Sequence, residues 1–114
     1  MALVSQGIAI LNGQSLSTSI GISGALQQIV GLILPAAWDG AAPITFQWSI
    51  DNGFWYDIFD RTGKEQSFLW TPNAFVPIQS QYGFYPYPYL QIRSGSRAKA
   101  VKQTATRQFV VISQ

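Results

Sequence analysis

Residues 44–50 carry the most regular pattern of apolar and polar positions in the chain. They read Ile-Thr-Phe-Gln-Trp-Ser-Ile, so large apolar side chains alternate with small or polar ones. A period of two is typical of a strand that buries one face. We therefore expect a half-buried strand here, with Trp48 on the side that faces the core.

A hairpin is expected directly after this strand. Asn52 and Gly53 both tolerate a positive φ, which the tight turns between paired strands require. The aromatic segment 54–59 is the expected return strand. A second turn over 60–63 and a further strand over 65–70 are expected to follow it.

Four more segments have strand character, and these are residues 7–11, 15–22, 89–93 and 108–112. Residues 28–34 form a continuous apolar run that Pro35 ends. A short helix over 25–34 is the alternative for this run, but Gly31 and Pro35 argue against a long helix. The length and β-branched content of the run favour a strand buried on both faces.

Together these segments predict an all-β protein. Ten glycines and six prolines punctuate the chain, as they do in sandwiches built from many short strands. We expect residues 1–114 to form one domain, a β-sandwich or jelly-roll-like fold of about eight short antiparallel strands. The uncharged residues 1–7 are expected to form a flexible arm that can join a neighbour as an added strand.

The composition narrows the chemistry available to this chain. It contains no histidine and no cysteine, and only 11% of its residues are charged. Disulfides, Cys/His zinc sites, thiol nucleophiles and histidine-based triads are therefore excluded. Asp57, Asp60 and Glu65 lie close in sequence, but nothing indicates a catalytic cleft. The spacing of Asp51, Asp57 and Asp60 matches no standard calcium loop. We expect a binding or structural protein without catalytic residues, cofactor or metal.

A membrane location is not expected either. The longest apolar stretch, residues 29–38, is interrupted by Gly31 and Pro35. It is much shorter than the ~20 residues that a membrane-spanning helix needs. The first residues also lack the basic region and the apolar run of a secretory signal.

Charge is distributed unevenly along the chain. Residues 1–38 carry no charged side chain, and five of the seven basic residues lie in the last 22, namely Arg93, Arg97, Lys99, Lys102 and Arg107. Such asymmetry favours contact with an acidic surface, and a solvated basic loop is the alternative. Nucleic acid is the less favoured partner, because the segment lacks the interleaved aromatic residues that single-strand binders use for stacking.

An aromatic run provides the second candidate surface. Residues 82–89 read Tyr-Gly-Phe-Tyr-Pro-Tyr-Pro-Tyr. The two prolines favour a rigid extended path, and tyrosine offers a large contact area at a low entropic cost. We expect a protein interface whose anchors are Tyr82, Phe84, Tyr85, Tyr87 and Tyr89, supported by Arg93, Arg97, Lys99 and Lys102. A loop that folds back over the core is the alternative.

Aromatic residues also flank the expected hairpin turn. Trp48, Phe54, Trp55 and Tyr56 lie within a few residues of Asn52. Rings near a loop rim can stack on sugars, so a carbohydrate-binding module that uses Trp55 is a competing hypothesis.

Three groups of segments carry a resemblance to a known class of proteins. The first is Gly31-Leu32-Ile33-Leu34-Pro35-Ala36-Ala37-Trp38 with Ile44-Thr45-Phe46-Gln47, the second is Ser49-Ile50-Asp51-Asn52-Gly53 through Tyr56-Asp57, and the third is Leu90-Gln91-Ile92-Arg93-Ser94-Gly95-Ser96 with Val101-Lys102-Gln103 and Arg107. In this order they resemble small proteins encoded among the virion structural genes of tailed bacteriophages and prophages. The resemblance spans about residues 7–112, whereas the aromatic run at 82–89 and the basic residues Arg97, Lys99 and Lys102 depart from it.

The resemblance implies a structural role in the phage particle. It implies a capsid decoration (cement) protein on the head exterior, made in the host cytoplasm. Such a protein would bind the major capsid protein or other virion proteins and would form a homo-oligomer, such as a trimer, at a local symmetry axis. A connector or tail-completion protein, or a sugar-binding module at a tail or fibre base, is the alternative within the same particle.

Overall fold

The computed structural model describes residues 3–21, 29–77 and 89–113. These residues form nine strands and no helix. The strands are β1 (Val4–Ile10), β2 (Ile20–Gly21), β3 (Ile29–Ile33), β4 (Ile44–Ser49), β5 (Tyr56–Asp57), β6 (Ser67–Phe68), β7 (Phe75–Pro77), β8 (Tyr89–Ser94) and β9 (Arg107–Ser113). The expected all-β class is confirmed.

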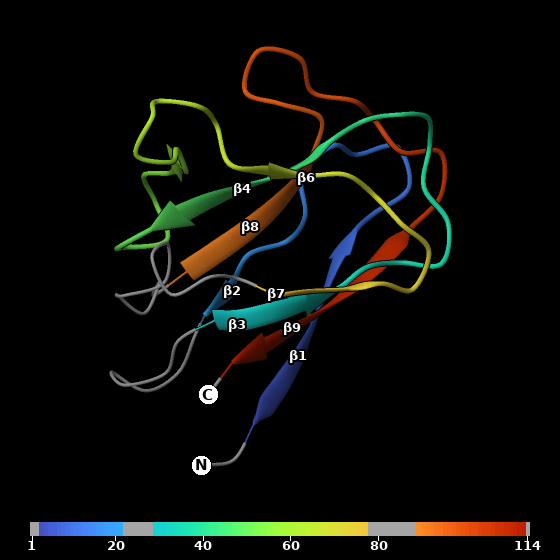
Figure 1. Ribbon diagram of the computed structural model, residues 1–114, viewed down its shortest axis with the longest axis horizontal. Coiled ribbons are helices and arrows are strands. Elements are labelled where there is room, and N and C mark those ends of the chain that lie inside the picture. The colour runs from blue at the N-terminus through green and yellow to red at the C-terminus, as the bar shows by residue number, and fades with distance from the viewer. Residues whose placement is uncertain (1–2, 22–28, 78–88, 114) are drawn as a thin grey trace.

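Two antiparallel sheets pack against each other (Figure 1). Sheet A has the order β1-β9-β3-β7. Sheet B has the order β2-β8-β4-β5, and β6 pairs with the first residues of β4. Val4 pairs with Ser113 in sheet A, so the first and last strands lie side by side and both ends of the chain lie at the same end of the molecule (Figure 1).

The core lies between the sheets because the apolar positions of the long strands recur with a period of two. The buried side chains from sheet A are Ile8, Ile10, Ile29, Leu32, Phe109 and Val111, and those from sheet B are Ile44, Phe46, Leu90 and Ile92. Trp38 closes one end of this core. Its ring meets Phe109 edge to face at 5.6 Å, and its Nε1 donates to the Ala42 carbonyl at 2.9 Å.

The strand expected over residues 44–50 is present as β4, and its apolar positions face the core. Trp48 is partly buried against the core cluster, as expected. The opposite face is not open to solvent, however, because Thr45 and Ser49 are fully buried. Arg93 from β8 covers Thr45, because its Nε donates to Thr45 Oγ1 at 3.0 Å.

The N-terminal expectations need two corrections. Residues Val4 to Gly7, expected in a flexible arm, belong to β1 and pair with the last strand. The strand expected over 15–22 is reduced to β2 and a single bridge between Leu16 and Arg93. The reason is that residues 17 and 18 run between the sheets, where Ser17 N donates to the Ile92 carbonyl and Thr18 N to the Ala9 carbonyl.

The strands after the hairpin are also shorter than expected. Segment 54–59 contributes only β5 and an isolated bridge between Phe59 and Glu65, and segment 65–70 contributes only β6. Ile58 lies between β5 and this bridge, and its side chain is buried in the core. Strand β7 had no sequence signal, because it has only three residues and includes Pro77.

Candidate protein-interaction surface

The connection between β4 and β5 exposes a group of large apolar side chains, which we call the hairpin-tip surface. Ile50 is 67% exposed, Phe54 74% and Tyr56 54%. They lie within seven consecutive residues at the end of one hairpin, so their exposed areas belong to one local feature. Exposed apolar groups gathered in this way are typical of binding surfaces.

The turn beneath this surface is held rigid by Asp51. Its Oδ1 accepts hydrogen bonds from Gly53 N at 2.8 Å, Phe54 N at 3.0 Å and Ser49 Oγ at 3.0 Å. The amides of Phe54 and Gly53, followed by the Ser49 hydroxyl, hold the pKa of Asp51 below its ordinary value. Asn52 has a φ of 60°, as expected, but Gly53 does not have a positive φ. Residues 50–55 connect β4 to β5, so the turn is wider than the tight turn that the sequence predicted. A fixed turn lowers the entropy lost when a partner binds.

Tyr89 is the one residue of the predicted tyrosine cluster that lies in the described part of the chain. It opens β8, pairs with Ser49 of β4 and is half-buried beside the base of the hairpin. Trp48 and Tyr56 are also adjacent there, with ring centroids 5.7 Å apart. The other predicted anchors, Tyr82, Phe84, Tyr85 and Tyr87, lie outside the described residues.

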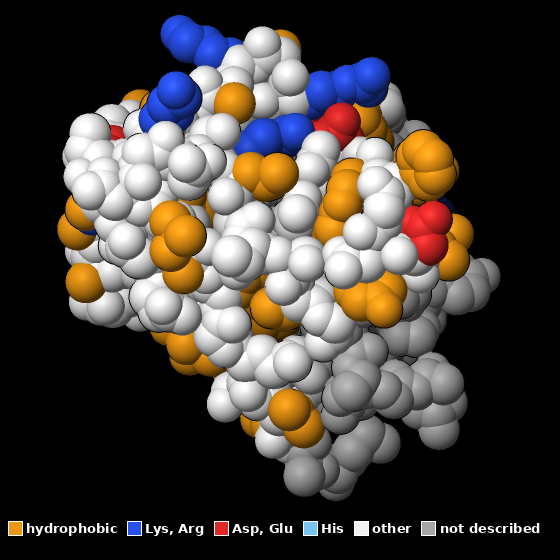
Figure 2. Space-filling view, turned by 180° about the vertical axis from the view of Figure 1, so that it is seen from behind, with side chains coloured by type: hydrophobic (Ala, Val, Ile, Leu, Met, Phe, Trp, Pro, Cys, Tyr) orange, Lys and Arg blue, Asp and Glu red, His pale blue; other side chains and the backbone are white. Residues whose placement is uncertain are grey.

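The predicted basic surface is made by the connection between β8 and β9, and we call residues 96–102 the basic loop. Arg97, Lys99 and Lys102 are exposed there. Ser96 and Lys99 exchange backbone hydrogen bonds of 2.9 and 3.1 Å, and this turn is entered through Gly95 with a φ of 98°. Lys and Arg side chains gather at the upper end of the face in Figure 2, the end at which Figure 1 places this connection.

Arg97 is exposed but tethered. Its Nε lies 3.5 Å from Asp57 Oδ2, and its guanidinium lies 5.9 Å from the centre of the Phe59 ring. Its backbone N donates to both carboxylate oxygens of Glu65. Lys99 and Lys102 have no ion-pair partner among the described residues.

Arg93 is not part of this surface, which corrects the sequence expectation. It is only 7% exposed, and its guanidinium forms ion pairs with Asp57 at 2.8 Å and with Glu65. A buried guanidinium must be paired, and these two carboxylates with Thr45 use its donors inside the molecule. Arg93 therefore ties β8 to β4, β5 and the segment before β6 rather than to a partner.

A second polar cluster centres on Gln103, whose burial the sequence did not indicate. Gln103 is fully buried. Its Oε1 accepts from Asp39 N and from Arg107 Nε, both at 2.9 Å, and its Nε2 donates to Ser94 Oγ at 2.8 Å. Asp39 in turn accepts from Thr104 and pairs with Arg107 at 3.1 Å.

All five carboxylates of the chain lie in the described residues, and each has a structural role. Asp39 and Asp51 bind loop amides, and Asp60 accepts from Thr62 and from Lys64 N. Hydrogen bonds from Thr104, and from Thr62 with Lys64, likewise hold the pKa values of Asp39 and Asp60 below their ordinary range. Asp57 and Glu65 pair with Arg93.

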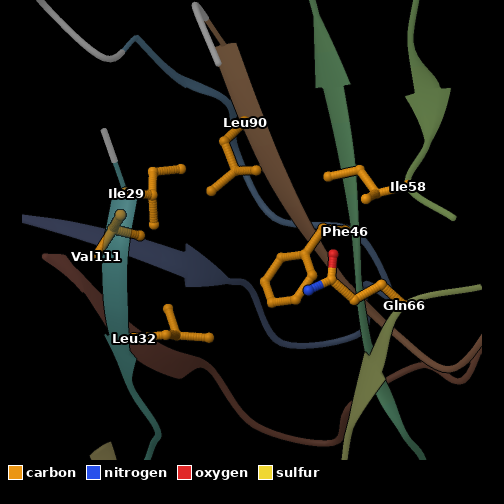
Figure 3. Close-up of a pocket in the computed structure, with 7 residues that line it drawn as sticks. All are labelled: Ile29, Leu32, Phe46, Ile58, Gln66, Leu90 and Val111. Atoms are coloured by element: carbon orange, nitrogen blue, oxygen red, sulfur yellow. The ribbon is translucent and has the colours of Figure 1, made fainter. Parts of the chain in front are cut away.

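The cavity between the sheets is small and apolar. Leu32 and Val111 from sheet A face Phe46 and Leu90 from sheet B across it, and the Gln66 amide reaches its side (Figure 3). Its volume of about 20 Å³ is near the space that one water occupies. It is a packing defect in the core and too small for an organic ligand.

The described residues contain neither a metal-binding cluster nor a membrane-spanning helix. No group of three or more His, Cys, Asp or Glu side chains is placed to hold a metal ion in this part of the chain. Nor do the described residues include a helix long and apolar enough to span a membrane.

Comparisons with protein-family models, curated proteins and solved structures found no match to this chain.

Proposed function

We propose that this chain is a structural protein of a tailed-phage particle and that it binds virion proteins through the hairpin-tip surface and the basic loop. The capsid exterior is its proposed location, and decoration of the head its proposed role. The observation that carries the binding role is the rigid turn at Asp51, which presents Ile50 and Phe54 to solvent. The phage context is supported by the sequence resemblance.

The two surfaces supply complementary parts of such an interface. Burial of an exposed apolar side chain contributes about 1.5–3 kcal/mol. Lys99 and Lys102 have no ion-pair partner among the described residues, so their side chains can meet acidic groups of a partner and speed association. Repetition over many equivalent sites on a shell makes even a modest single contact effective.

A binding assay on purified capsid shells tests this proposal. We expect Phe54→Ser to reduce the occupancy of the shells at subsaturating protein by about tenfold or more, because one large apolar contact is lost. Leu69→Ser is the matched control, since Leu69 is 80% exposed and lies away from the hairpin. Equal occupancy for the two folded variants would remove the hairpin tip from the interface.

Copy number separates a head role from a connector role. Quantitative staining of purified particles should show this chain at a level comparable with that of the shell subunit. A level comparable with that of a single small ring would instead assign the chain to the connector or the tail.

A sugar-binding module remains the competing function, because Phe54 and Tyr56 expose their rings and Trp55 is half-buried beside them. Aromatic rings at a loop rim can stack on a saccharide. A glycan array on the folded chain decides between the two. Glycan binding that Trp55→Ala abolishes would favour this function over a protein interface.

A further inference from the structure

Part of the outer edge of strand β1 has no pairing strand among the described residues. One side of β1 pairs along its whole length with β9. On the other side, the Ala9 carbonyl accepts from Thr18 N, so the backbone groups of Ala9 point away from β9. Because the direction alternates along a strand, the groups of Leu3, Ser5 and Gly7 point the same way. No described residue bonds to them on that side.

This edge differs from the other sheet edges of the described chain. Strand β7 is short and contains Pro77, and β2, β5 and β6 have two residues each. Short strands and proline are the usual protection against unwanted strand pairing. Strand β1 has seven residues, no proline and no charge, and Leu3, the residue directly before it, is 64% exposed. A long, uncharged edge of this kind is a template for another strand.

We propose that residues 3–7 pair with the same residues of a second copy of this chain, antiparallel and about a two-fold axis. The register places Ser5 opposite Ser5 of the second copy, and Leu3 opposite Gly7. It satisfies every free group of Leu3, Ser5 and Gly7 with about six hydrogen bonds. A shift by two residues toward the core would require Ala9, whose carbonyl already accepts from Thr18. A shift the other way would place Gly7 opposite residue 1, which lies outside the described residues.

The side chains agree with this register. Gly7 pairs with Val110 of β9. Leu3 of the second copy, opposite Gly7, would therefore lie in line with Gly7 and Val110 across the strands, on the outer face of sheet A. Gly7 has no side chain, and the Gln108 amide lies 2.8 Å from the position that a Cβ would take. The exposed Leu3 is thereby covered by Gly7 and Gln108, and no charge is buried at the contact.

The pairing adds a self-association surface to the proposed structural role, and it is measured on the chain alone. Capsid binding and dimer formation can therefore fail independently. Sedimentation velocity over a concentration series should show a monomer–dimer equilibrium. Ser5→Pro, which removes a donor from the edge but none from the β1–β9 ladder, should leave a folded monomer. Thermal unfolding of that variant checks that it folds.

A crosslinking experiment tests the register, because the chain has no cysteine of its own. Directly opposite residues of a hydrogen-bonded pair lie about 5.5 Å apart at Cα, within reach of a disulfide. Ser5→Cys should form a disulfide-linked dimer under mild oxidation at least tenfold faster than Leu3→Cys. Two copies of residue 3 would lie about 13 Å apart along the strands. Equal rates, or a wild-type chain that stays monomeric at every concentration, would overturn the proposal.

Discussion

The outer faces of the two sheets have opposite characters. On sheet B, the outward positions of β4, β5 and β8 carry Thr45, Asp57 and Arg93, which form a buried network with Glu65. On sheet A, Ala9, Ile33, Val110 and Ile112 face outward half-buried, and Phe75 is 53% exposed. The strands of sheet A contain one charged residue, Arg107, and it pairs with Asp39.

This difference between the outer faces shows that the placement of charge determines which sheet can bind a partner through its outer face. On sheet B, Arg93 is paired with Asp57 and Glu65 within the chain, so these charges need no partner from another molecule. The outward side chains of sheet A are uncharged and mostly apolar, with Ser5 and Gln108 as polar exceptions, so a partner can cover this face without desolvating an ion. The absence of charge over residues 1–38, which contain β1 and β3, has its structural counterpart in this face.

The largest effect is expected from breaking the network on sheet B. Arg93→Ala removes a buried guanidinium and leaves Asp57 and Glu65 without their partner. The free energy of unfolding should fall by about 3–5 kcal/mol, as it does when one member of a buried ion pair is removed. Urea denaturation measures this loss. Arg97→Ala, at an exposed position beside the same acids, should change stability by less than about 0.5 kcal/mol. Similar losses for the two variants would contradict the distinction between them.

An exchange of nearly isosteric side chains compares the two faces directly. Thr45→Val removes the hydroxyl that accepts from Arg93 and donates to the Gly95 carbonyl at 2.7 Å, which should cost about 1–3 kcal/mol. Val110→Thr introduces a hydroxyl on the outer face of sheet A, where water can reach it. We expect that change to cost less than about 1 kcal/mol. Thermal unfolding of both variants gives the comparison, and a costlier change on sheet A would reverse it.

The smallest effect on stability is expected when the pH is lowered into the acid range. The pKa values of Asp39, Asp51 and Asp60 are lowered in the folded state from an ordinary 3.8. Each therefore contributes stability above that value, and the contribution is lost as the pH falls through 3.8 toward the folded-state pKa. The strands of sheet A contain no carboxylate. Protection against hydrogen exchange, relative to the intrinsic rate at each pH, should thus fall first in the loops that these aspartates hold, and Asp51→Asn should remove that pH dependence at the hairpin.

The sequence predicted the strands at 44–49 and 29–33, but not the fate of segment 15–22, whose apolar and polar residues also alternate. The period of two over residues 44–50 and the Asn-Gly turn located β4 and its hairpin, because both signals are local. The sequence did not predict β7 or the crossing of Ser17 and Thr18 between the sheets, because those conformations depend on hydrogen bonds to distant strands. The same limit applied to the candidate site. Arg93 carries a charge in a basic stretch, and only the fold shows that it faces Asp57 and Glu65.

The pairing of Val4 with Ser113 has a practical consequence for labelling. A fluorophore or a fused peptide attached at either end of the chain leaves the molecule from the same place, away from the connection between β8 and β9 (Figure 1). A tag on either side is therefore suited to reporting on contacts of the basic loop. The same tag would crowd Leu3 and Ser5, so measurements of self-association call for a cleavable fusion.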